Sequence, residues 1–123
     1  MKNILLVDDE QQAVDIFQAA LQEKGNNVVI ATDAKSALKF CTDQKFDVLL
    51  IDEMMPDMSG NELIKTLRKM DTTAAVPIIV LTNYSDDVLV KEAMEAGAND
   101  YVLKYQMVPE DLADKVNKLI SPE

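Results

Sequence analysis

Five short apolar segments alternate along this chain with stretches in which apolar residues recur every three or four positions. Short apolar runs bounded by polar residues are typical of strands that are covered on both faces, as in a parallel sheet. Strict alternation of strands and helices implies parallel strands joined by right-handed crossovers. The sequence therefore predicts an α/β fold with a five-stranded parallel sheet and five helices on both faces. The strands are expected over residues 4–7, 28–31, 46–51, 78–81 and 101–103.

The stretches between these segments carry helix start and stop signals. Asp33 is a suitable N-cap residue for the second helix. Ser59 followed three residues later by Glu62 fits the capping-box pattern at the start of the third helix. Gly25 and Gly97 stand where the first and fourth helices are expected to end, and glycine is the preferred residue just past a helix C-terminus.

Length and charge limit the classes of function. The 123 residues correspond to about one domain, and we expect a single domain over residues 1–123. Hydrophobic residues make up 48% and charged residues 28%, as in a globular protein. The net charge of −10 argues against a nucleic-acid-binding or membrane-binding surface, since both need a basic face. It fits a protein that binds a cation or a basic partner.

The single cysteine, Cys41, excludes an intrachain disulfide. It lies on the apolar stripe of the second predicted helix, so we expect a small core residue there. No apolar run approaches the 18 or so residues of a membrane span, and the first run is too short for a signal peptide. These features together predict a cytoplasmic protein.

Polar residues follow four of the predicted strands at the point where each strand ends. Asp8 and Asp9 follow the first strand, Asp52 the third, Thr82 the fourth and Lys104 the fifth. Because the carboxyl ends of parallel strands meet at one edge of the sheet, these side chains are expected to lie close together. Ligands of open parallel sheets bind at this edge.

This set of side chains has a definite chemistry. Three carboxylates in one place repel one another unless a cation joins them, and hard oxygen ligands suit Mg²⁺. A lysine and a hydroxyl beside the metal ion would neutralise the oxygens of a transferring phosphoryl group. Since aspartate carboxylates form acyl phosphates, the pattern predicts that Asp52 accepts a phosphoryl group.

The ordered set of motifs resembles the receiver domain of response regulators in two-component signalling. The resemblance covers nearly the whole chain and implies a flavodoxin-like, doubly wound sheet with strand order 2-1-3-4-5. It also implies a phosphorylatable switch. The motifs are Asp8-Asp9, Asp52 with Met55-Pro56 and Gly60, Thr82, Tyr101 and Lys104.

The resemblance assigns a phosphoryl donor and a metal site. Asp52 would take its phosphoryl group from a phosphohistidine on a sensor histidine kinase or a histidine phosphotransfer protein. Asp9 and Asp52 would bind Mg²⁺ through their side chains, and Met54 through its backbone carbonyl. Asp8 would act through a metal-bound water. The protein would be a phospho-acceptor with limited self-catalysed phosphotransfer and autodephosphorylation, and not a conventional enzyme.

The resemblance also implies a switching mechanism. Lys104 would bridge to the phosphoryl group, Thr82 would move to hydrogen-bond it, and Tyr101 would turn into the space that Thr82 leaves. The face formed by the fourth helix, fifth strand and fifth helix would then select a downstream effector. Met54 and Tyr84 would flank the pocket and slow hydrolysis by shielding Asp52 from water.

One position departs from the family pattern. Tyr105 follows Lys104, where the family commonly has a proline preceded by a cis peptide bond. A cis bond without proline costs about 2.5–4 kcal/mol, so we expect a differently shaped loop over residues 105–108. Tyr105 is also a candidate extension of the signalling face.

Several alternative interpretations remain open from the sequence. Asp8, Asp9 and Glu10 also suit a helix N-terminus, and Glu53 and Asp57 are interpreted as surface charges. An aspartyl-phosphate phosphatase usually has a second acid two residues after the nucleophile, a position that Met54 occupies here. A degenerate receiver acting as a constitutive interaction module is the other alternative, although no acid or lysine of the motif is lost.

Overall fold

The computed structural model describes residues 2–83 and 87–120. Its centre is one parallel five-stranded sheet with strand order β2-β1-β3-β4-β5. This order confirms the expected doubly wound topology, in which the chain switches direction across the sheet after β2. The strands are β1 (Asn3–Val7), β2 (Asn27–Ala31), β3 (Val48–Asp52), β4 (Ile78–Thr82) and β5 (Asp100–Leu103).

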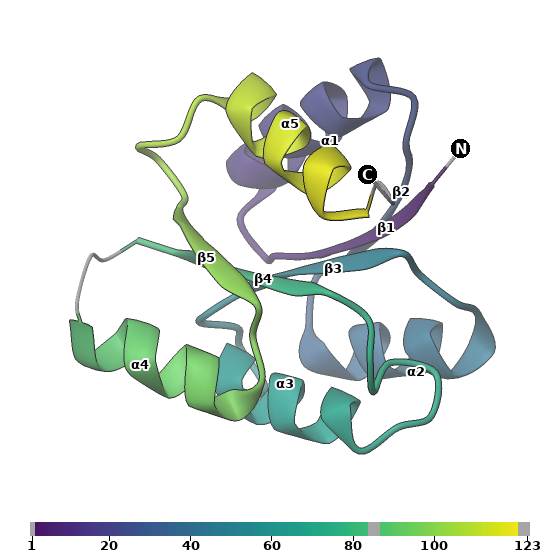
Figure 1. Cartoon of the computed structure of the whole chain (residues 1–123), viewed down its shortest axis with the longest axis vertical. Coiled ribbons are helices and arrows are strands. Elements are labelled where there is room, and N and C mark those ends of the chain that lie inside the picture. Colours follow the sequence, from purple (N-terminus) through teal and green to yellow (C-terminus); the bar gives the residue numbers. More distant parts are fainter. Residues whose placement is uncertain (1, 84–86, 121–123) are drawn as a thin grey trace.

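Five helices cover the two faces of the sheet. Helices α1 and α5 lie on one face, and α2, α3 and α4 lie on the other (Figure 1). The fold class predicted from the alternation of elements is therefore confirmed. The helices are α1 (Gln11–Glu23), α2 (Ala34–Asp43), α3 (Gly60–Arg68), α4 (Asp87–Ala96) and α5 (Pro109–Ile120).

The strands are apolar on both sides because each face packs against helices. In β1, Ile4 and Leu6 belong to the core cluster beneath α1 and α5, whereas Leu5 and Val7 belong to the cluster on the opposite face. All four are fully buried. Burying a side chain of this size contributes roughly 1.5–3 kcal/mol, so these strands explain much of the stability of the sheet.

The predicted helix ends agree with the structure. The carboxylate of Asp33 accepts the backbone N–H of Ser36 at 2.7 Å, and the Ser59 hydroxyl accepts that of Glu62 at 3.2 Å. Gly25 and Gly97 have φ values of 87° and 123°, in the left-handed region that favours glycine. These residues fix where α1 and α4 end and where the chain returns to the sheet.

The third strand begins later than predicted and ends one residue later. It runs from Val48 to Asp52 because Asp52 pairs with Leu81 of β4. Phe46 precedes the strand but is still buried. The extension matters because it makes Asp52 part of the sheet, held by the ladder instead of by a loop.

Cys41 is a core residue, as predicted. Its side chain is fully buried in the cluster beneath α2, and burial raises the pKa of its thiol to about 11. None of the helices within residues 2–83 and 87–120 combines the length and the apolar character needed to cross a bilayer.

Candidate functional site

The polar residues that follow the strands gather at one edge of the sheet. Asp8, Asp52, Thr82 and Lys104 are each at most 5% exposed. The strand register explains the grouping, since β1, β3, β4 and β5 are neighbours in the sheet and end at the same edge. Buried polar side chains need partners to offset their lost hydration. The arrangement therefore concentrates charge and hydrogen-bonding capacity in a small volume.

Lys104 occupies the centre of this group. Its Nζ lies 2.9 Å and 3.0 Å from the two carboxylate oxygens of Asp8, and 3.5 Å from Oδ2 of Asp52. Burial alone would lower the pKa of this lysine, but its hydrogen bonds to Glu10 and Asp8 raise the pKa above the ordinary value. Lys104 is thus a buried ammonium group next to Asp52.

The surroundings of Asp52 favour its neutral form, even with Lys104 nearby. Burial and the charge of Asp8 raise its pKa to about 7, although Lys104 and a hydrogen bond from the Met54 backbone N–H act in the opposite direction. A carboxyl group with so high a pKa is poised to gain a further cation, because a nearby positive charge favours its ionised form.

The donor set fits a divalent cation. One carboxylate oxygen from each of Asp8, Glu10 and Asp52 lies within 4.8 Å of the others. Oxygen donors of this kind are the ligands that Mg²⁺ prefers, usually with one or two carboxylates in direct contact. Asp9 is exposed and lines a cavity of about 230 Å³ next to Asp52 and the Met54 segment. Asp9 and Asp52 therefore line one cavity, with Asp9 at its exposed side.

Glu10 is a site residue that sequence reasoning did not assign. Its Oε1 forms an ion pair with Lys104 Nζ, and its Oε2 accepts the Tyr105 hydroxyl at 2.7 Å. The hydrogen bond from Lys104, followed by that from Tyr105, lowers the pKa of Glu10. An acid just before a helix is common for helix capping, so its position alone gives no signal. Its partner Tyr105 is 95 positions away, so the contact is visible only in the structure.

Glu53 is not merely a surface charge, and that expectation is wrong. It is half-buried, and its Oε2 accepts the hydroxyl of Thr82 at 2.5 Å. Its backbone N–H also donates to the carbonyl of Leu81 at 2.9 Å. The proposed switch hydroxyl is therefore engaged by the residue that directly follows Asp52.

Of the two residues expected to tune the pocket, the structure describes Met54 and not Tyr84. The side chain of Met54 is exposed, at 70%, on the rim of the 230 Å³ cavity that Asp52 also lines. Tyr84 lies outside the described residues. Tyr101, the expected aromatic switch residue, is half-buried on β5 and packs against the core cluster of the α2, α3 and α4 face. Met54 is therefore beside the cavity next to Asp52, and Tyr101 is on the edge strand β5.

The loop after Asp52 is held closely against the end of β3. Gly60 opens α3 so near the strand that an added Cβ would lie 2.6 Å from the carbonyl oxygen of Asp52 and 2.9 Å from the Cα of Glu53. The Gly60 N–H donates to the carbonyl of Glu53 at 2.7 Å. Glycine is therefore required here for the close approach of α3 to the site.

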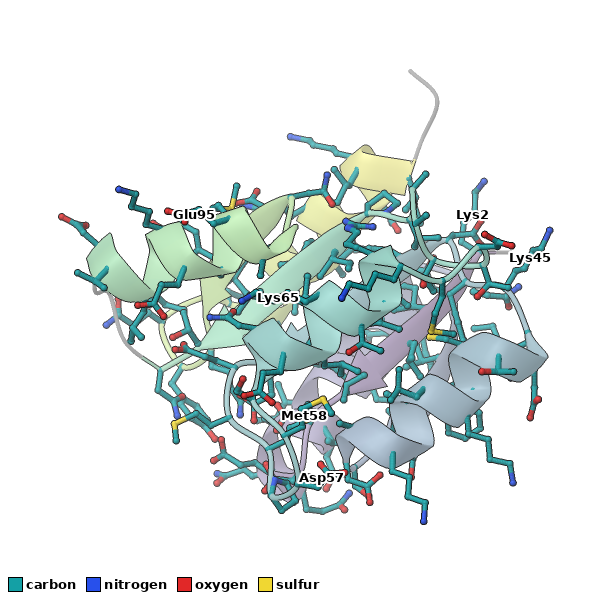
Figure 2. All side chains as sticks on the ribbon, turned by 90° about the horizontal axis from the view of Figure 1, so that it is seen from below. Lys2, Lys45, Asp57, Met58, Lys65 and Glu95 are labelled. Carbon is teal, nitrogen blue, oxygen red and sulfur yellow. The ribbon has the colours of Figure 1, made fainter. Side chains whose placement is uncertain are left out.

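Asp57 has a structural role that the interpretation as a surface charge did not include. It is exposed, but its carboxylate accepts the backbone N–H groups of Ala34 and Lys35 at 2.9 Å and 3.1 Å. Figure 2 shows Asp57 on this loop beside the start of α2. The loop that follows Asp52 is thereby connected to the N-terminus of α2.

Tyr105 is 56% exposed at the rim of the site. Its ring centroid lies 5.8 Å from Lys104 Nζ, and its hydroxyl donates to Glu10. The peptide bonds in the described ranges are all trans, including the one after Lys104. The loop therefore differs from the proline-containing pattern and places an aromatic ring over the lysine.

The comparisons with known proteins agree with this geometry. The family model of the response regulator receiver domain matches residues 4–117. The response regulator SaeR of Staphylococcus epidermidis is 33% identical over 121 residues, which cover 98% of this chain and 51% of the relative. The chain spans about half the length of the curated relatives it matches.

Solved structures show the same similarity over the whole chain. A putative response regulator from Chloroflexus aurantiacus superposes with a TM-score of 0.91 at 28% identity, and the match covers 98% of each chain. The beryllofluoride-activated receiver domain of DrrB from Thermotoga maritima gives a TM-score of 0.86 at 32% identity, with 98% of this chain and 97% of that chain covered. With the buried acids and Lys104 at the ends of its strands and with these matches, the chain belongs to the response regulator receiver domain family.

Proposed function

We propose that Asp52 is the phosphoryl acceptor of this receiver domain and that its phosphorylation changes a partner-binding face. The observation that carries the proposal is the buried pair of Asp52 and Lys104, whose Oδ2 and Nζ are 3.5 Å apart at the carboxyl edge of the sheet. This arrangement places a nucleophilic oxygen beside a fixed positive charge. Positioning and electrostatic stabilisation are what phosphoryl transfer requires of a protein.

The chemistry of the step is a single displacement. A carboxylate oxygen of Asp52 attacks the phosphorus of a phosphohistidine, a new O–P bond forms, and the P–N bond to the donor imidazole breaks. Lys104 neutralises charge on the transferring group, and the Thr82 hydroxyl leaves Glu53 to donate to it. A bound Mg²⁺ would supply the remaining positive charge.

We assign the metal site to the acids around Asp52. The side chains of Asp9 and Asp52 and the backbone carbonyl of Met54 would hold the ion, with Asp8 acting through a water molecule. The cluster of carboxylate oxygens from Asp8, Glu10 and Asp52 supports a cation at this place. Glu10 is a further candidate for the shell around the ion.

The partners follow from the family and from the switching mechanism. We propose a sensor histidine kinase or a histidine phosphotransfer protein as donor, and an effector that docks on the face formed by α4, β5 and α5. Tyr101 would turn inward when Thr82 moves. Tyr101 pairs with Val80 of β4, two residues before Thr82, so the two side chains lie on the same face of adjacent strands. Met54 and Tyr84 would shield the acyl phosphate from water and lengthen its lifetime.

We also propose the domain organisation, the catalytic class and the cellular setting of the protein. Residues 1–123 would form one receiver domain, a phospho-acceptor with limited self-catalysed phosphotransfer and autodephosphorylation instead of an enzyme with a separate substrate. The free, buried thiol of Cys41 supports a reducing, cytoplasmic setting. The net charge of −10 supports the absence of direct nucleic-acid or membrane binding.

The assignment of Asp52 is tested by incubating the wild type and Asp52→Asn with acetyl phosphate and Mg²⁺ and measuring intact mass. We expect a phosphoryl adduct on the wild type alone. Equal adducts on both proteins would show that another residue is modified. A wild type that gains no adduct and does not respond to beryllofluoride would indicate a constitutive interaction module. Sustained turnover of p-nitrophenyl phosphate would indicate a phosphatase.

A further inference from the structure

We propose that Tyr105 and Glu10 are positioning residues that restrain Lys104 in the unphosphorylated protein and oppose its movement toward the phosphoryl group. This inference rests on the proposed function, because it concerns the lysine that would contact the phosphorylated Asp52. It assigns a role to the tyrosine that stands directly after Lys104. It also assigns one to the glutamate that precedes α1.

Lys104 makes its closest contacts with acids other than Asp52. Its ammonium group has three N–H donors. It is hydrogen-bonded to Asp8 and to Glu10, whereas Asp52 Oδ2 is 3.5 Å away. A nitrogen–oxygen distance of 3.5 Å is beyond the usual range for a charge-assisted hydrogen bond. In the resting protein, therefore, Lys104 is bound to other acids more closely than to the phosphoryl acceptor.

Glu10 would not hold this position well by itself. Its side chain is 42% exposed, so water competes for its carboxylate, and an ion pair with one exposed partner is usually weak. The second carboxylate oxygen is, however, hydrogen-bonded by the Tyr105 hydroxyl at 2.7 Å. One carboxylate oxygen of Glu10 thus contacts Lys104 and the other accepts from Tyr105, so both oxygens have a protein partner.

Tyr105 contacts the same lysine in a second way. Its ring centroid is 5.8 Å from Lys104 Nζ, within the range in which an ammonium group is attracted to an aromatic face. Tyr105 is exposed, and its hydroxyl bond to Glu10 spans 95 positions of the sequence. Lys104, Glu10 and Tyr105 thus form a closed set of contacts that includes no atom of Asp52.

A phosphoryl group on Asp52 would compete with this set for the lysine. The group adds roughly 1.5–2 negative charges and three strong acceptor oxygens beside Nζ. A movement of Lys104 toward them would act against its bond to Glu10. The Tyr105 hydroxyl keeps Glu10 in place, so it favours the resting arrangement and lowers the affinity of the site for a phosphoryl group.

The decisive variant is Tyr105→Phe, which keeps the ring over Lys104, removes the hydroxyl and leaves the net charge unchanged. With saturating Mg²⁺, we expect beryllofluoride to bind about two- to fivefold more tightly than to the wild type, as measured by calorimetry. In metal-free protein, we expect the urea midpoint of unfolding to fall. A residue that served only the fold would weaken both properties, so a fall in both would overturn the proposal.

Repeating the substitution Tyr105→Phe in a Glu10→Ala variant tests whether Tyr105 acts through Glu10. In Glu10→Ala, the hydroxyl of Tyr105 has lost its acceptor, so adding Tyr105→Phe should change neither the beryllofluoride affinity nor the urea midpoint. The same gain in affinity in both backgrounds would contradict a role through Glu10. If the wild type fails to bind beryllofluoride, the proposed function fails. The urea midpoints of the metal-free proteins still test the coupling of Tyr105 and Glu10. If Tyr105→Phe shifts the midpoint equally in the wild type and in Glu10→Ala, the inference is overturned.

Discussion

The hydroxyl of Thr82 donates a hydrogen bond of 2.5 Å to the carboxylate of Glu53, the residue that directly follows Asp52. Thr82 ends β4, and Asp52 ends the neighbouring strand β3. The side chain expected to bind a phosphoryl group therefore already has an anionic acceptor in the resting protein. Phosphorylation must exchange one acceptor for another.

The first prediction concerns this exchange. Glu53→Ala removes the acceptor and its charge, whereas Glu53→Gln removes the charge and keeps an acceptor oxygen. We expect Ala at this position to give faster phosphorylation by acetyl phosphate than Gln, by about fivefold for a hydrogen bond worth about 1 kcal/mol. The measurement is the rate of adduct formation by intact mass.

The control for the first prediction uses a background without the hydroxyl. In Thr82→Val, the Ala and Gln variants of Glu53 should have equal phosphorylation rates, because neither can then accept from Thr82. A difference that persists in this background would mean that Glu53 acts in another way.

The second prediction concerns Lys104, whose side chain is buried among acids. Lys104→Met leaves Asp8 and Asp52 without their internal cation, and breaking a buried ion pair in this way typically costs about 3–5 kcal/mol. We expect this loss in urea unfolding of metal-free protein at pH 8. It should shrink at pH 5, where the raised pKa of Asp52 lets a proton neutralise that carboxylate.

Lys65→Met is a matched control, since Lys65 is exposed on α3 (Figure 2). An exposed charge contributes little, so this variant should change the free energy of unfolding by less than about 1 kcal/mol at either pH. An equally large loss at pH 5 and pH 8 for Lys104→Met would indicate lost packing and not lost charge compensation.

The third prediction follows from the pKa of Asp52, which is raised from 3.8 to about 7 in the folded protein. Between these values the folded state retains a proton that the unfolded chain has released. Stability from this group is therefore present at low pH and is lost as the pH rises through about 7. Asp52→Asn removes the penalty, and we expect it to stabilise metal-free protein at pH 8 by on the order of 2 kcal/mol.

The pH dependence provides the check on this third prediction. Urea unfolding in the presence of a chelator should show a stabilisation by Asp52→Asn at pH 8 that nearly disappears at pH 4. Added Mg²⁺ should stabilise the wild type more than the variant, because the ion favours ionised Asp52. A stabilisation of the same size at both pH values would contradict the assigned pKa.

The fourth prediction concerns the close approach of α3 to the site. In Gly60→Ala, the new methyl group would lie 2.6 Å from the carbonyl oxygen of Asp52, and this atom belongs to the backbone and has no freedom to rotate away. We expect a loss of about 1–3 kcal/mol in stability and a reduced rate of phosphorylation. Urea unfolding and adduct formation measure the two effects.

Gly25→Ala is the matched control, because it strains the backbone far from Asp52. Gly25 has φ of 87°, so alanine there is strained, but nothing lies within 4 Å of the added Cβ. We expect a cost of about 1 kcal/mol and an unchanged rate of phosphorylation. If both variants slowed phosphorylation equally, the effect at Gly60 would be a general consequence of lower stability.

The fold and the centre of the site could be predicted because both depend on local pattern. Apolar runs that end in Asp8, Asp52, Thr82 and Lys104 specify strands, and parallel strands bring their carboxyl ends together. The burial of these four residues follows from the same pattern. The boundary of β3 was less accurate, because the pairing of Asp52 with Leu81 depends on the neighbouring strand.

The acids around the centre could not be placed in this way. Glu10 and Glu53 each lie directly beside a motif, but the direction of a side chain beyond a strand end depends on the loop and not on the spacing. Their partners, Tyr105 and Thr82, are 95 and 29 positions away. Asp57 likewise caps a helix that precedes it by more than 20 positions. Such contacts become visible only in three dimensions.

Cys41 has a practical consequence for experiments on this protein. It is the chain's one cysteine, and its thiol is fully buried beneath α2, the helix that Asp57 caps from the loop after Asp52. A thiol reagent can therefore react only when this face of the molecule opens. The labelling rate of the unmodified wild type measures how often that opening occurs. Comparing the rate with and without beryllofluoride would show whether the signal reaches α2, without any introduced probe.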